Sequence, residues 1–153
     1  MRFNHSKLFV IAVTLLALIP YEVSALDFRS VTVPKAVLYD APATTAKKVL
    51  LLSQHYPVEI VVNLGDWLKV RDAIGSLNWV EAKQLSNKHT VIVTTNNAEI
   101  RQAANAISKV VATLEKEVLL DVVEAKLNNG WLKVKHRDGV TGYILRSSTW
   151  GFE

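Results

Sequence analysis

Hydrophobic and polar residues alternate in short runs along most of this chain, and turn-forming residues separate the runs. The clearest case is residues 65–80, where Leu68 and Val70 alternate with polar or aromatic neighbours before a turn that contains Gly75. A second run follows the turn and ends in Trp79-Val80. Two alternating runs joined by a glycine-bearing turn are typical of a β-hairpin with one buried face.

The same hairpin returns sixty-four positions later. Residues 130–134 repeat residues 66–70 apart from the first position, and Gly139 repeats Gly75. In both copies twelve positions separate the tryptophan of the first run from the aromatic residue of the second. Because aromatics, glycine and alternation all keep the same phase, we interpret the pattern as an internal duplication.

Five or six short strands are predicted in each copy, which favours an all-β fold of two small, partly open barrels. We place the first barrel at residues 26–87 and the second at 88–153, with a polar linker at 86–89. Residues 49–52 are apolar without alternation, which predicts a buried strand. Residues 98–126 are rich in Ala, Glu and Lys and would favour a helix by propensity alone. We nevertheless expect strands there, because the corresponding segment of the first copy is β-rich.

The first twenty-five residues have the layout of a secretory signal peptide. A positively charged start precedes an apolar run at 8–19, and Pro20 and small residues up to Ala25 follow. The run is too short for a membrane-spanning helix, which needs about 20 apolar residues. We therefore predict cleavage after Ala25, no membrane anchor afterwards, and export to the periplasm or cell wall.

Composition excludes several kinds of chemistry. The chain has no cysteine, so it has neither disulfides nor a cysteine nucleophile, and no G-x-S-x-G motif is present. The three histidines after the predicted signal, His55, His89 and His136, lack metal-ligand spacing. We predict no enzyme, no metal and no cofactor. The formal net charge of +4 fits an anionic envelope better than nucleic acid for an exported protein, although it also fits simple solubility.

Strand alternation also predicts which side chains face outward. Residues two apart share a face, so Leu68 and Val70 lie in the core and the intervening aromatic and cationic residues lie on the opposite face. The second copy repeats this arrangement. Our candidate ligand-binding residues are therefore Trp67, Lys69, Arg71, Trp79, Trp131, Lys133, Lys135 and Tyr143. An aromatic ring beside fixed cations suits a glycan or peptide that carries carboxylates. Alternatively, the tryptophans pack the two barrels together or lie under a loop.

These motifs resemble the bacterial SH3-like (SH3b) family. The family has a conserved sequence pattern that is similar to residues 65–80 and to residues 130–144. This pattern consists of Gly-Trp-x-Lys-Val, a later glycine and a terminal Gly-Trp/Tyr-Val/Ile. The family's first motif corresponds to residues 38–42 and 100–104. The sequence departs from the family at Asn78, which stands where the family has glycine, and at Ala103-Ala104, which stands where it has Gly-Pro.

The resemblance implies a non-catalytic cell-envelope binding module. Peptidoglycan or its peptides are the leading ligand class, so the expected partner is a cell-wall glycan or peptide. The alternative is a periplasmic interaction or scaffold subunit that serves an envelope protein.

Overall fold

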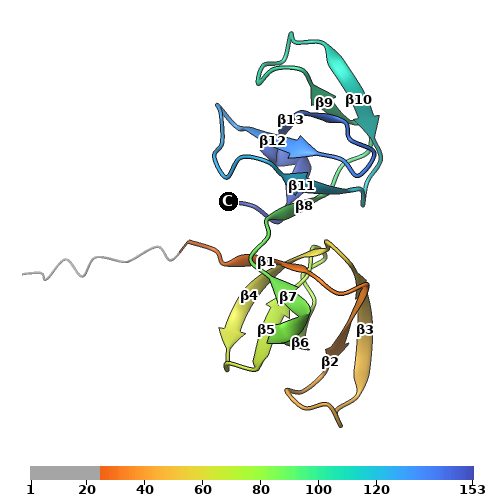
Figure 1. The fold of residues 1–153 in the computed structure, drawn as a ribbon, viewed down its shortest axis with the longest axis vertical. Helices are drawn as coiled ribbons and strands as arrows, with labels where there is room; N and C mark the ends of the chain where they lie inside the picture. Colours follow the sequence, from red (N-terminus) through yellow and green to blue (C-terminus); the bar gives the residue numbers. More distant parts are fainter. Residues whose placement is uncertain (1–24) are drawn as a thin grey trace, which may run out of the picture.

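The computed structural model describes residues 25–153, which fold into two antiparallel β-sheets of seven strands each (Figure 1). The predicted signal peptide lies outside the described residues except for Ala25. The first sheet has the order β3-β2-β6-β5-β4-β1-β7 and the second the order β10-β9-β13-β12-β11-β8-β14, so the two units share one topology. The prediction of an all-β chain with two tandem SH3-like units is confirmed.

The elements of the first unit are β1 (Phe28–Val31), β2 (Lys35–Tyr39), β3 (Lys48–Ser53), β4 (Pro57–Asn63), β5 (Trp67–Arg71), β6 (Leu77–Glu81), the 3-10 turn η1 (Ala82–Gln84) and β7 (Leu85–Ser86). Those of the second unit are β8 (Thr90–Val93), β9 (Ala98–Arg101), β10 (Val110–Leu114), β11 (Leu119–Val122), β12 (Trp131–Lys135), β13 (Thr141–Leu145), η2 (Arg146–Ser148) and β14 (Thr149–Trp150). Residues 98–126 form strands, as the duplication predicted. Within residues 25–153, no helix is long and apolar enough to cross a membrane.

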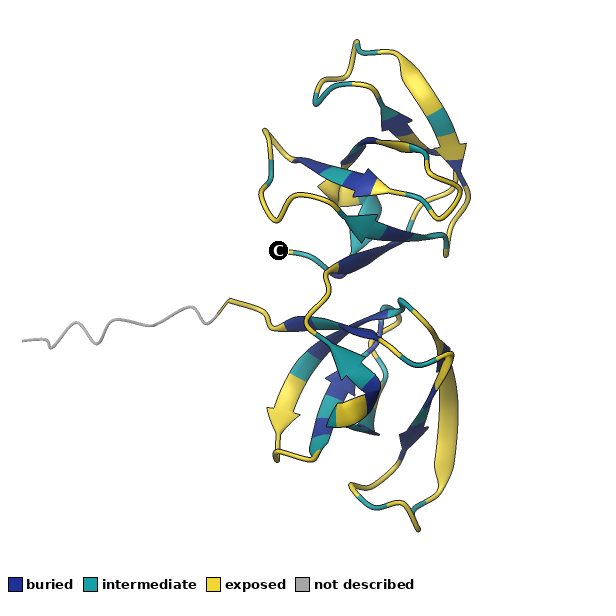
Figure 2. Ribbon diagram, viewed as in Figure 1, coloured by how far each residue is buried: buried dark blue, intermediate teal, exposed yellow. Residues whose placement is uncertain are grey.

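Each unit has its own hydrophobic core, built from the inward positions of its strands (Figure 2). Leu68 and Val70 on β5 are fully buried, and so are Leu132 and Val134 on β12. These are the positions that alternation assigned to the core in both copies. The hairpins β5–β6 and β12–β13 therefore contribute equivalent side chains to two separate cores.

The prediction that residues 49–52 form a buried strand is wrong. These residues do form most of β3, but Val49 is 49% exposed and Leu51 57% exposed, and only Leu52 reaches the core. The reason is position, because β3 lies at the edge of its sheet and pairs only with β2. A bulge also shifts the β2–β3 register: Leu38 pairs with Leu50 and Tyr39 with Lys48, so Val49 is the extra residue.

The two units dock through their terminal strands. The rings of Phe28 on β1 and Trp150 on β14 meet edge to face, with centroids 5.1 Å apart. Lys88, between the sheets, pairs with Asp121 of the second unit at 2.8 Å. The tryptophan that packs against the other unit is therefore Trp150, which the sequence analysis did not consider for this role.

Replacing Gly142 by alanine should destabilise the second unit by about 1–3 kcal/mol, the usual range for overpacking. A Cβ at Gly142 would lie 2.5 Å from the Arg101 carbonyl oxygen and 2.6 Å from Ile100 Cγ2, so β13 could not keep its place beside β9. Thermal unfolding of the two variants measures the effect. The matched control is Asn78→Ala, at the equivalent position of the first unit, where a Cβ is already present. Equal melting shifts in both variants would contradict the packing explanation.

Candidate ligand-binding site

A row of aromatic and cationic side chains crosses the outer face of the first unit. Tyr39 on β2 pairs with Trp79 on β6, and Trp79 pairs with Lys69 on β5. The Lys69 Nζ atom lies 5.8 Å from the centroid of the Trp79 ring, within cation–π range. Trp67 meets the Tyr39 ring edge to face at 5.5 Å. The strand register thus brings three of the predicted residues together: Trp67, Lys69 and Trp79.

A groove of about 530 Å³ runs beside Trp67. One wall comes from the loop residues 43–45 between β2 and β3, and the other from Asp66, Glu81 and Lys83 around β5 and η1. At its rim the Lys83 ammonium group lies 2.8 Å from the Glu81 carboxylate, whose hydrogen bond raises the pKa of Lys83. The groove therefore combines one aromatic wall with polar groups that can hydrogen-bond a ligand.

Arg71 has a structural partner. Its Nη1 atom donates to both carboxylate oxygens of Glu59, at 2.9 and 3.2 Å, and Glu59 is only 8% exposed. The pair joins β4 to β5, where the two residues are in register. Because its guanidinium group is engaged in holding two strands together, Arg71 is a weaker ligand candidate than Lys69.

The second unit repeats the cation–π pair, but its lysine also has a carboxylate partner. Lys133 Nζ lies 5.9 Å from the Tyr143 ring centroid and 2.6 Å from the Glu124 carboxylate. The hydrogen bond from Lys133 to Glu124 raises the pKa of the lysine. By contrast, no carboxylate of the described chain pairs with Lys69. The two copies thus differ in whether the lysine is free to meet a ligand.

The expectation that Trp131 is exposed on an outward face is wrong, because this side chain is only 7% exposed. The burial accompanies the longer loop between β11 and β12. This loop turns back on the strand at Asn128, and Asn128 and Trp131 exchange backbone hydrogen bonds of 2.8 and 2.9 Å. Trp67, the equivalent residue, follows a shorter loop and stays half-buried. The alternation places the residue on the face opposite Leu132, but it does not predict how far the residue is exposed.

Lys135 lies apart from the other predicted residues, at the end of β12, where it lines a cleft between the two units.

Tyr39 is the residue that the sequence analysis missed. A usable signal was present, because Leu38 is a core position and its neighbour must face outward. Asp72 takes the ordinary role of turn capping, since its Oδ1 atom accepts hydrogen bonds from the N–H groups of Ile74 and Ser76.

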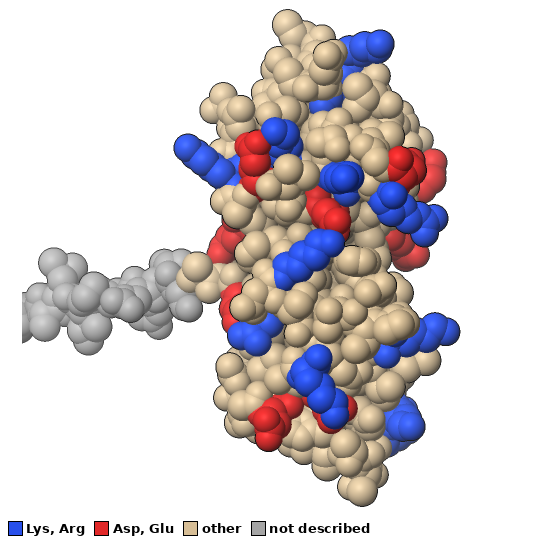
Figure 3. Space-filling model, viewed as in Figure 1, with Lys and Arg blue, Asp and Glu red and all other residues tan. Residues whose placement is uncertain are grey.

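The charges on this molecule are interspersed. On the face shown in Figure 3, lysines and arginines alternate with acidic side chains and form no continuous basic stripe of the kind that nucleic-acid-binding proteins use. Among residues 25–153, no three His, Cys, Asp or Glu side chains are grouped to hold a metal ion.

A family model described as "Bacterial SH3 domain" matches the chain twice, at residues 32–87 and 94–151. No protein of curated function matches significantly. Similar solved structures include NlpC2 and NlpC1 from Trichomonas vaginalis, at 17% and 18% identity and each with a TM-score of 0.37. They cover 82% of this chain and 48% and 45% of their own. An NlpC/P60 family protein from Bacillus cereus matches at 14% identity and a TM-score of 0.38, covering 80% of this chain and 55% of its own. The chain thus spans about half the length of these structures.

Proposed function

Because this chain belongs to the bacterial SH3 domain family, with both halves matched, we propose that it is a non-catalytic binding module of the cell envelope. Its ligand is peptidoglycan or one of its peptides. The chain is exported and acts in the periplasm or at the cell wall. The binding site is the aromatic groove of the first unit, which we define as Trp67, Trp79 and Lys69 with the adjoining loop 43–45. The buried Tyr39 supports it, because its ring packs edge to face against Trp67.

The observation that carries this proposal is Lys69, which has no ion-pair partner within residues 25–153, lies 5.8 Å from the Trp79 ring centroid and shares a face of β5 with the half-buried Trp67. Sugar rings and peptide planes stack on flat aromatic surfaces, and a fixed ammonium group attracts the carboxylates of wall peptides. The groove beside Trp67 supplies a concave surface with further polar groups. Around Lys133 the situation differs, because its charge is already neutralised by Glu124. The first unit is therefore the binding unit.

Replacing Lys69 by glutamine should weaken binding to purified sacculi several-fold while leaving the melting temperature nearly unchanged. The Lys69 side chain is half-buried, contacts the Trp79 ring, and has no ion-pair partner to lose within residues 25–153. The measurement is co-sedimentation with sacculi, paired with thermal unfolding. Trp67→Ala should have a larger effect, since truncating one central aromatic contact typically costs a binding site about 2 kcal/mol or more.

Lys133→Gln is the matched control, because it removes the equivalent lysine of the second unit and should leave sedimentation unchanged. A wild-type protein that does not sediment with sacculi would refute the peptidoglycan ligand and favour the alternative of an envelope protein partner. Normal sedimentation by a folded variant carrying both Lys69→Gln and Trp67→Ala would remove these residues from the site.

A further inference from the structure

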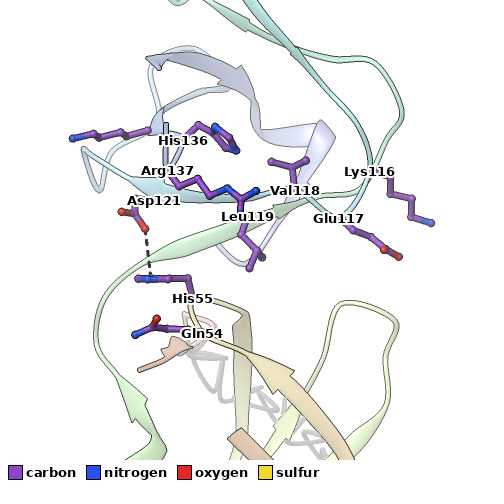
Figure 4. Close-up of a pocket in the computed structure, with 10 residues that line it drawn as sticks. Gln54, His55, Lys116, Glu117, Val118, Leu119, Asp121, His136 and Arg137 are labelled. Atoms are coloured by element: carbon purple, nitrogen blue, oxygen red, sulfur yellow. Dashed lines mark ion pairs between the residues drawn. The ribbon is translucent and has the colours of Figure 1, made fainter. Parts of the chain in front are cut away.

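A second cavity of about 420 Å³ lies between the two units, away from the aromatic groove (Figure 4). The first unit contributes Gln54 and His55 from the turn between β3 and β4. The second unit contributes residues 116–119 and Asp121 around the start of β11, and residues 135–137 at the end of β12. Neither unit alone encloses this space, so we call it the interdomain cleft.

The interdomain cleft contains an arginine without a carboxylate partner. Among the five arginines of residues 25–153, three are paired: Arg29 with Asp27, Arg71 with Glu59, and Arg101 with Glu99. Arg137 and Arg146 have no acidic partner within this part of the chain. Of these two, only Arg137 lines the cleft, and its side chain points into it (Figure 4).

Polar and apolar side chains line the cleft together with Arg137. Val118 and Leu119 form an apolar wall, and His136 lies beside it with its Nδ1 atom 2.8 Å from the Asp138 carboxylate. Within residues 25–153, the Nε2 atom of His136 has no hydrogen-bond partner beside this contact of Nδ1. On the opposite side His55 lies 3.8 Å from Asp121, whose charge Lys88 already neutralises at 2.8 Å.

We propose that the interdomain cleft binds a carboxylate-bearing ligand with an adjoining apolar group, and that Arg137 is the residue that holds the carboxylate. A guanidinium group donates two parallel hydrogen bonds to a carboxylate, which is the strongest pairing available to it. The apolar wall of Val118 and Leu119 accommodates the neighbouring part of the ligand. The proposal is independent of the proposed function, because it uses no residue of the aromatic groove.

The charge of the cleft favours one carboxylate over a doubly charged phosphate. Its lining has three cationic side chains, Lys116, Lys135 and Arg137, and two carboxylates, Glu117 and Asp121. Lys88, which pairs with Asp121, and Asp138, which pairs with His136, add one charge of each sign at its border, so the lysines, the arginine and the carboxylates together leave a single positive charge for the ligand to balance. A doubly charged phosphate would keep one negative charge unbalanced, and the Glu117 and Asp121 carboxylates would repel it.

The test uses the full chain and N-acetyl-leucine as the probe, with N-acetyl-leucinamide as the uncharged counterpart and inorganic phosphate as the dianion. NMR titration should show saturable shifts of the His55 and His136 ring signals with N-acetyl-leucine and none with the amide. Arg137→Gln should weaken this binding about tenfold or more, since it removes both charge-assisted hydrogen bonds. Arg146→Gln is the control, because it removes the other unpaired arginine outside the cleft and should bind like the wild type.

The proposal is overturned by an absence of saturable shifts, by equal shifts with the amide, or by wild-type affinity of Arg137→Gln. Equal weakening by both arginine variants would show that only net charge matters and would also overturn it. Tighter binding of phosphate than of the carboxylate would refute the ligand class. The ring signals report on the wild-type protein itself, so the test does not depend on the variants alone.

Discussion

Leu132→Ala is expected to lower the free energy of unfolding of the second unit by about 2–5 kcal/mol, the range found when a buried leucine is truncated to leave a cavity. Leu132 is completely buried in the core of that unit. A domain of about 60 residues buries a limited fraction of its surface and is only marginally stable. We therefore expect this variant to leave the second unit largely unfolded near its normal melting temperature.

Leu68→Ala should have the same effect on the first unit, because Leu68 occupies the equivalent position and is equally buried. Hydrogen exchange followed by mass spectrometry can assign the loss of protection to one unit or the other. Ile107→Ala serves as the control, since this side chain is 97% exposed and should change stability by no more than about 0.5 kcal/mol. A loss below about 1 kcal/mol in both leucine variants would contradict the assignment of these residues to the cores.

Gly151→Ala is expected to separate the two units. Gly151 has a φ of +117°, which L residues rarely adopt, and forcing one into it costs on the order of 1–3 kcal/mol. A Cβ would also lie 2.6 Å from the Pro57 Cβ of the first unit and 2.7 Å from the Thr90 carbonyl oxygen. The side chain would therefore push β14 away from the first unit and break the contact of Trp150 with Phe28.

Small-angle scattering should show a larger radius of gyration for Gly151→Ala, with both cores still folded. Gly139→Ala is the matched control, because Gly139 has a φ of +99° but open space around its Cβ position. This control carries the backbone strain without the clash, so it should lose stability and remain compact. An unchanged radius of gyration for Gly151→Ala would mean that the interface tolerates the added methyl group. If the units do separate, binding of N-acetyl-leucine in the interdomain cleft should be lost as well.

The cores of this protein were predictable because their signal is local. Alternation places Leu68, Val70, Leu132 and Val134 on one face, and the duplication removes the ambiguity that a single hairpin would leave. The same reasoning brought Lys69 beside Trp79, since both positions follow from the register of a single hairpin. The repeat also predicted strands correctly at residues 98–126, where composition alone favoured a helix.

What could not be predicted depends on contacts between distant parts of the chain. The exposure of β3 follows from its place at the edge of the sheet, which a run such as Val49 to Leu52 does not reveal. The burial of Trp131 depends on how one loop folds back. The interdomain cleft brings His55 and Arg137 of two different units together, and it depends on contacts between the units such as those of Phe28 with Trp150 and His55 with Asp121. No periodicity within one unit carries that information.

The bulge at Val49 has a consequence for the behaviour of the protein in crowded solution. An apolar strand with one open side is a template onto which a strand from another molecule can add, and this process starts fibrillar aggregation. The extra residue breaks the regular spacing of hydrogen-bonding groups, so an incoming straight strand cannot stay in register along β3. The second unit has the same interruption in β10, where Val110 pairs with Arg101 and Ala112 with Ile100, leaving Val111 extra. Backbone irregularity therefore protects β3 and β10, with Lys48 adding a charge to the edge of the first unit, and we expect the exposed aliphatic side chains there not to template a second molecule.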